Sequence, residues 1–64
     1  MTKYERRQSI IRLLNEQPGI KVARLAEVLD VSEGTIRNDL TALEKQQKLQ
    51  RVHGGAVLIE EAAD

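Results

Sequence analysis

The sequence predicts a small, mainly α-helical domain in which three helices are followed by a β-hairpin. The stretch from Val22 to Leu43 contains two short amphipathic patterns separated by a tight turn. The segment LQRVHGGAVLI at 49–59 contains two strand-like runs on either side of a glycine pair, which is the pattern of a hairpin. A helix-turn-helix followed directly by a hairpin, the wing, is a winged helix-turn-helix, and this fold class favours DNA binding.

The first helix is predicted over about residues 3–16. Thr2 and Glu5 have the spacing of a capping box, which satisfies free backbone N–H groups at a helix start. The apolar stripe that follows consists of Ile10, Ile11 and Leu14, continued toward the N-terminus by Tyr4 or Arg7. Proline cannot continue a helix, so the segment QPG at 17–19 ends it. The next two residues, 20–21, could form a one-bridge strand paired with the wing.

The helix-turn-helix begins with a second helix whose apolar residues recur at helical spacing. These residues, which make one buried face, are Val22, Leu25, Ala26 and Leu29. Asp30 and Val31 form the turn, and Ser32 is a suitable N-cap for the third helix. Val31 also has the spacing of a hydrophobic staple to Ile36. The third helix, the recognition helix at 32–46, has a core stripe that consists of Ile36, Leu40 and Leu43.

The wing is predicted at 49–59. Its Gly54-Gly55 pair lies between the two strands and supports the positive φ angles that two-residue type I′ or II′ hairpin turns require. The winged helix-turn-helix domain is therefore expected to cover residues 1–58. Residues 59–64 are acidic and rich in alanine, and we interpret them as the start of a linker.

Composition excludes several classes of function. The chain has no cysteine and one histidine, so we expect no disulfide, no metal site and no cofactor. We expect no enzyme either, because catalysis needs convergent titratable groups in a pocket. No apolar run approaches the roughly 20 residues that span a bilayer, so the sequence predicts a cytoplasmic protein without membrane contact. RNA binding is disfavoured because Tyr4 is the only aromatic residue available for base stacking.

The formal net charge is zero, but the charges are unevenly distributed. Glu60, Glu61 and Asp64 lie in the last five residues, and the remainder carries ten basic and seven acidic groups, a net of +3. The basic residues form two groups, which are Lys3, Arg6 and Arg7 at the start and Lys45, Lys48 and Arg51 near the wing. Phosphate contact needs a local basic face of this kind, although each charge taken singly is better explained as solvated surface.

Two motifs match a known family. The residues that fit the signature S-x-x-T-I-R-x-D-L are Ser32, Thr35, Ile36, Arg37, Asp39 and Leu40. The segment RVHGGA at 51–56 fits a hairpin motif, and the positions that fit the family's first helix are Arg6, Ile10 and Leu14. Over roughly residues 6–57 the chain resembles the N-terminal DNA-binding domain of DeoR-type bacterial transcription regulators. It departs from that pattern at Asn38, where a second arginine is usual, and at Gln47, where glycine is usual.

The resemblance also implies partners. Full-length members of this family carry a C-terminal domain that binds a phosphorylated sugar or related metabolite, and they oligomerise largely through it. We therefore expect this chain to be the isolated DNA-binding module, monomeric by itself, of a homo-oligomeric regulator. The implied function is sequence-specific binding of double-stranded DNA, in a repressor of a sugar or metabolite operon. The alternative is a winged helix that binds proteins without DNA, and the polar outer face of the recognition helix argues against it.

The recognition helix is expected to enter the major groove with its N-terminal half nearest the bases. Arg37 can donate two hydrogen bonds to guanine, unless it pairs internally with Glu33 or Asp39. Asn38 can pair with adenine or remain solvated, and Thr41 is a weaker candidate for a base contact. Asp39 itself is expected to orient an arginine and not to touch DNA.

The remaining candidate residues are expected to contact the DNA backbone or the minor groove. Ser32 and Thr35 lie at a helix N-terminus, which attracts phosphate, although Ser32 also serves as the cap. Arg24, near the start of the second helix, can reach the flanking backbone or remain solvated. The expected wing contacts are Arg51, His53, Gly54 and Gly55, with His53 alternatively bonded to local backbone.

Overall fold

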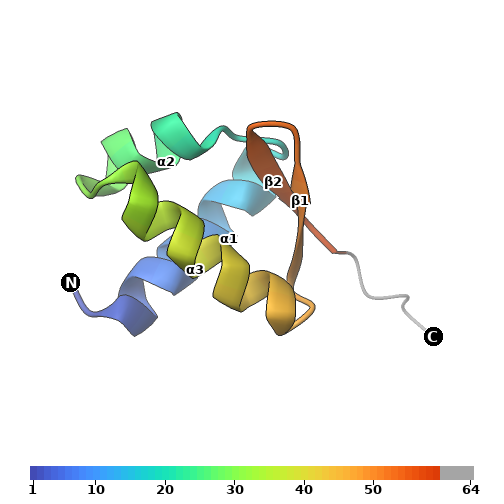
Figure 1. The fold of residues 1–64 in the computed structure, drawn as a ribbon, viewed down its shortest axis with the longest axis horizontal. Helices are drawn as coiled ribbons and strands as arrows, with labels where there is room; N and C mark the ends of the chain where they lie inside the picture. The colour runs from blue at the N-terminus through green and yellow to red at the C-terminus, as the bar shows by residue number, and fades with distance from the viewer. Residues whose placement is uncertain (60–64) are drawn as a thin grey trace.

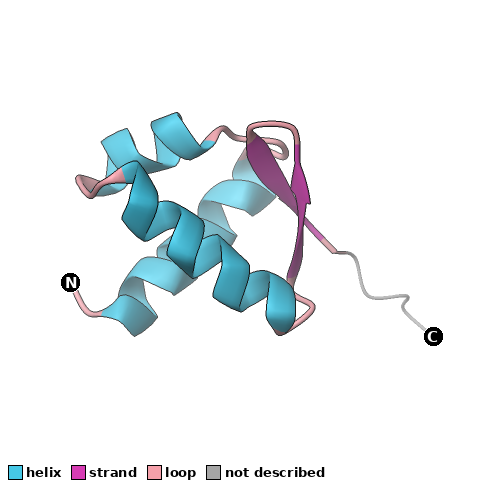
Figure 2. Cartoon of the chain, in the orientation of Figure 1, coloured by secondary structure: helices cyan, strands magenta, loops and turns pink. Residues whose placement is uncertain are grey.

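The computed structural model describes residues 1–59, which form three helices and a hairpin (Figure 1). The elements are α1 (Lys3–Glu16), α2 (Val22–Leu29), α3 (Glu33–Lys45), β1 (Leu49–Val52) and β2 (Gly55–Leu58). In Figure 2, α3 crosses in front of α1, α2 lies above, and the hairpin stands to the right. This arrangement confirms the predicted winged helix-turn-helix. Of the expected linker only Ile59 lies within the described residues, and none of the described helices is long and apolar enough to cross a membrane.

The helix starts follow the local signals in the sequence. The capping box of α1 is complete: the Glu5 N–H donates to Thr2 Oγ1 at 3.1 Å, and the Thr2 N–H donates to Glu5 Oε1 at 2.8 Å. Ser32 caps α3, because its Oγ accepts the Thr35 N–H at 3.1 Å. These bonds satisfy N–H groups that have no partner within the helix, so the two starts are confirmed where they were predicted.

The end of α3 contains the strain that the unusual Gln47 implies. The Lys48 N–H donates to the Leu43 carbonyl at 3.0 Å and the Gln47 N–H donates to the Glu44 carbonyl at 2.9 Å. This bond pair is a Schellman motif, which requires a left-handed residue and favours glycine there. Gln47 occupies that position at φ +60°. The helix therefore ends as it would with glycine, and Gln47 adopts the unfavourable backbone conformation.

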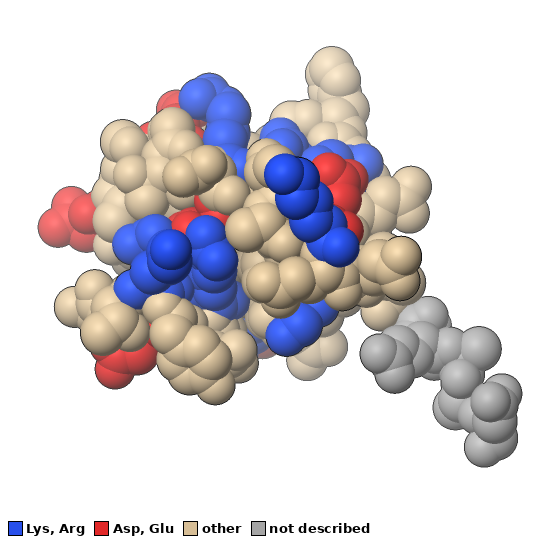
Figure 3. Space-filling model, turned by 60° about the horizontal axis from the view of Figure 1, so that its bottom comes forward, with Lys and Arg blue, Asp and Glu red and all other residues tan. Residues whose placement is uncertain are grey.

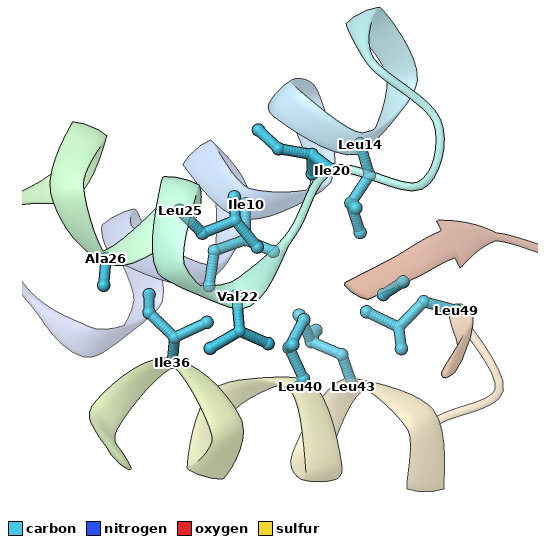
Figure 4. Close-up of a cluster of buried hydrophobic side chains, with 11 residues drawn as sticks. Ile10, Leu14, Ile20, Val22, Leu25, Ala26, Ile36, Leu40, Leu43 and Leu49 are labelled. Atoms are coloured by element: carbon cyan, nitrogen blue, oxygen red, sulfur yellow. The ribbon is translucent and has the colours of Figure 1, made fainter. Parts of the chain in front are cut away.

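The core lies where the three helices and the hairpin meet (Figure 4). Its buried apolar side chains are Ile10, Leu14, Ile20, Val22, Leu25, Ala26, Ile36, Leu40, Leu43, Leu49 and Ala56. In Figure 4, α3 lies along the lower edge and its labelled side chains point toward those of α1 and α2. Tyr4 is 73% exposed and does not continue the stripe of α1, whereas Arg7 lies against α3.

The hairpin turn lies one residue earlier than predicted. Val52 pairs with Gly55, so the turn residues are His53 and Gly54, and Gly55 belongs to β2. Only Gly54 has a positive φ, +74°, which is the sign pattern of a type II turn and not of type I′ or II′.

The reason for this placement lies on the other side of β2. Lys21 forms an isolated bridge with Gly55, which confirms the expected one-bridge pairing. The backbone approaches so closely that a Cβ on Gly55 would lie 2.3 Å from the Ile20 carbonyl oxygen. The second glycine of the pair is therefore needed inside the strand, and the first supplies the turn.

Candidate nucleic-acid interface

The outer face of α3 forms a shallow, open hollow. Its lining residues are Ser32, Gly34, Thr35, Arg37, Asn38 and Thr41, five of which the sequence singled out. They share one side because the core positions of α3 turn the opposite side inward. Thr35 is half-buried and the other five are exposed. The hollow offers guanidinium, amide and hydroxyl groups to a ligand that lies along the helix.

Arg37 is held only by a solvent-exposed ion pair. Its Nη2 lies 3.0 Å from Glu33 Oε1, and both side chains are about half exposed. Pairs of this kind contribute about 0–1 kcal/mol, so the guanidinium can exchange this partner for a base. Of the two internal partners weighed for Arg37, the structure shows Glu33. Thr41, one turn further on, donates its hydroxyl to the Arg37 carbonyl at 2.9 Å.

The N-terminus of α3 combines a cap with a free hydroxyl donor. Ser32 Oγ accepts the Thr35 N–H and donates to Thr35 Oγ1 at 3.0 Å. Ser32 is thereby used in capping, whereas the Thr35 hydroxyl, which accepts from Ser32, can still donate its own hydrogen. The first N–H groups of a helix also lack internal partners, and an anion at this end suits the helix dipole.

The wing tip is held by Lys21, to which the sequence analysis gave no role in the interface. The Lys21 ammonium donates to the His53 carbonyl at 2.8 Å, and the Val22 N–H donates to the Gly54 carbonyl at 2.9 Å. His53 and Gly54 are exposed, whereas Gly55 is buried beneath them. The available signal was that Lys21 belongs to the segment 20–21, which was expected to pair with the wing.

The other candidate cations are held by weak local bonds. Arg51 donates its backbone N–H to Glu44 Oε2 at 3.2 Å and its Nε to the Gly55 carbonyl at 3.4 Å. Arg24 pairs with Glu27 one turn along α2, and both side chains are mostly exposed. The Arg24 side chain thus stays mostly exposed, whereas Arg51 is half-buried against the wing.

Asp39 is the buried polar group of this region. Its side chain is 1% exposed and accepts hydrogen bonds from Arg6, through Nε and through Nη2 at 2.9 Å, and from Arg7 Nε at 3.0 Å. Burial raises the pKa of the Asp39 carboxyl, but the hydrogen bonds and charges of the two arginines outweigh it and hold that pKa below its ordinary value. The arginines that Asp39 orients thus come from α1 and do not include Arg37. Helical spacing could have placed Asp39 inward, because it adjoins core positions of α3.

Figure 3 shows lysine and arginine side chains in separate groups, with acidic side chains beside some of them. Within residues 1–59 no group of three or more histidine, cysteine or acidic side chains is arranged to hold a metal ion. The charged groups in this view are lysine and arginine side chains, some of them beside carboxylates. They suit contact with an anionic polymer at several separate places.

Comparison with known proteins identifies a matching family and several relatives. Residues 6–62 match the family model described as the DeoR-like helix-turn-helix domain. The chain is 51% identical over 59 residues to the HTH-type transcriptional regulator GolR of Listeria innocua, which covers 92% of this chain and 23% of that protein. It is 49% identical over 59 residues to a putative galactitol utilization operon repressor of Escherichia coli, covering 92% of this chain and 53% of that protein.

A further relative is the lactose phosphotransferase system repressor of Streptococcus mutans, 46% identical over 56 residues, which cover 88% of this chain and 22% of the repressor. The chain thus spans between about a fifth and a half of the length of these relatives, all of which are named as regulators or repressors. No solved structure matches the chain.

Proposed function

The chain belongs to the DeoR-like helix-turn-helix domain family of DNA-binding transcriptional regulators, and from that premise we propose how it divides the work of recognition. The observation that carries the proposal is the open face of α3, where Arg37, Asn38 and Thr41 lie together in one hollow. We assign the reading of base edges in the major groove to these three side chains. We expect Arg37 to contribute most to sequence preference, because a bidentate pair with guanine discriminates against the other bases by about 1–3 kcal/mol.

Backbone contacts are assigned to groups around this face. Thr35 and the N-terminus of α3 bind one phosphate, with Ser32 holding the cap. Arg24 reaches the flanking backbone from α2. Arg51, His53 and Gly54 approach the backbone or minor groove from the wing, whose tip Lys21 holds in place. We assign no DNA contact to Gly55, because it is buried and its lack of a side chain allows β2 to pack against residues 19–20.

The larger protein is proposed to be a cytoplasmic repressor of a sugar utilisation operon. Two relatives are named as repressors of galactitol and lactose systems, and this chain aligns with a fraction of their length. We propose that the remainder binds a phosphorylated sugar and joins subunits into a homo-oligomer. The single module then binds weakly, and linking two modules raises avidity by about 10²–10⁴.

The test separates base reading from backbone binding. A duplex selected by this domain from a random pool is compared with a scrambled duplex, in Arg37→Ala and in Arg51→Ala. We expect Arg37→Ala to lose most of the preference, and Arg51→Ala to weaken both duplexes alike while lowering the salt slope by about 1. Equal losses on both duplexes in both variants would contradict this division of roles.

Nitrogen-15 NMR of the unmodified domain tests DNA binding itself. Duplex DNA at low salt is expected to shift the amide signals of 32–41 and 51–56, and the shifts should fade as salt rises. If no signals shift at either salt concentration, a protein-binding winged helix becomes the better explanation.

A further inference from the structure

A second hollow, away from the outer face of α3, lies between the start of α1 and the end of α3. Its lining residues are Lys3, Tyr4, Arg7, Gln8, Leu43, Gln46 and Lys48, and its volume is about 240 Å³. Both helix ends lie along the lower edge of Figure 1, and Figure 3 turns that edge forward, showing groups of lysine and arginine side chains, some with acidic side chains beside them. Leu43, 3% exposed, supplies its apolar wall.

The polar side chains that line this hollow are cations or neutral hydrogen-bond donors. Three of its side chains are cations, and the tyrosine hydroxyl and two glutamine amides can donate hydrogen bonds as well. Within residues 1–59 no carboxylate lines this hollow. Glu5, which neighbours the hollow in sequence, already has Oε1 bonded to the Thr2 N–H. A site in which every polar side chain donates suits an oxyanion.

Arg7 is fixed in the wall of the hollow from behind. Its Nε donates to Asp39, its side chain is only 20% exposed, and its Nη groups donate to no acceptor within residues 1–59. Asp39 is shared with Arg6, so one carboxylate balances two guanidinium groups and leaves a surplus positive charge. An anion that approaches this surplus charge is attracted to it. Arg7 is therefore held by its Nε bond, and its Nη groups reach solvent, where they can donate to an added acceptor.

From these observations we propose that the α1–α3 hollow binds a phosphate group through Arg7, Lys3 and Lys48. The phosphate can come from a DNA backbone, in which case the inference extends the proposed interface, or from a free phosphorylated small molecule. Planar guanidinium and flexible ammonium groups are the usual partners of phosphate oxygens.

The first experiment is NMR of the 64-residue chain with two probes. Inorganic phosphate is titrated at constant ionic strength with chloride as the balancing ion, and a short duplex is titrated separately, while the side-chain amide signals of Gln8 and Gln46 are followed. Shifts with the duplex assign the site to the DNA backbone. Shifts with phosphate and none with the duplex assign it to a free phosphate compound. Shifts with neither probe overturn the proposal.

A charge-matched pair of variants provides the control. Gln46→Glu places a carboxylate in the hollow at nearly constant volume, whereas Gln50→Glu adds the same charge at an exposed site on β1. Both positions are exposed, so the two variants differ in distance from the hollow and not in burial. We expect Gln46→Glu to weaken binding of the probe that shifted the wild-type signals by several-fold, because its carboxylate lies beside the bound anion, and Gln50→Glu to change that binding much less. Equal effects of the two variants would overturn the proposal. Recognition by α3 is judged separately from the Arg37 signals in the duplex titration, so either idea can fail without the other.

Discussion

Replacing Gly55 with alanine should lower the stability of this domain substantially, because β2 crosses the backbone of residues 19–20 too closely for any side chain. A Cβ at this position would lie 2.3 Å from the Ile20 carbonyl oxygen and 2.8 Å from that of Gly19. An ordinary contact begins near 3.4 Å, so strand and loop must separate by about 1 Å. The atoms in the way belong to the backbone, which also carries the Gly19 N–H bond to the Ala56 carbonyl at 3.0 Å.

Overpacking of this kind costs about 1–3 kcal/mol. In a domain of this size a loss of 2 kcal/mol lowers Tm by about 8–16 °C, which thermal unfolding followed by circular dichroism resolves easily. Gly34→Ala is the matched control. Its new methyl group would meet only Ser32 Oγ at 3.8 Å, and alanine is favoured over glycine in a helix by up to about 1 kcal/mol, so Tm should rise. If Gly55→Ala melts within about 2 °C of wild type, the tight crossing is not what requires glycine.

Two further predictions concern stability. Gln47→Gly should raise the free energy of unfolding by about 1 kcal/mol, measured by urea denaturation, because glycine adopts the left-handed conformation at the end of α3 without strain. Asp30→Gly, at φ +57°, should give a smaller increase, since aspartate tolerates that conformation better than glutamine. Asp39→Asn should cost about 3 kcal/mol by leaving two arginines without their carboxylate. Because the folded-state pKa of Asp39 lies below the unfolded value, its ionised form stabilises the fold above about pH 4, and this contribution is lost as pH falls through the folded-state pKa. The unfolding free energy of the wild type should therefore fall more steeply with acid than that of Asp39→Asn, and parallel curves would exclude this linkage.

The helices were predictable because their determinants are local. The capping box, the proline after α1 and the Ser32 cap each act within a few residues, and the apolar period of 3.6 identifies the buried faces without knowledge of the partner. The same locality explains why α1 was predicted to within its observed bounds, 3–16. The family signature was also recognisable from the sequence, because its residues lie within one contiguous stretch, 32–40.

Tertiary structure decided what depends on residues far apart in the chain. Either glycine of the pair could serve a turn by local rules, and only the crossing of β2 over residues 19–20 assigns Gly54 to the turn and Gly55 to the strand. Asp39 meets Arg6 across 33 positions, and Lys21 meets the His53 carbonyl across 32. Local propensity specifies where a helix begins and which side is apolar, whereas the packing of helices against each other specifies which polar groups meet. The cationic hollow between α1 and α3 exists only because that packing brings the two helix ends together.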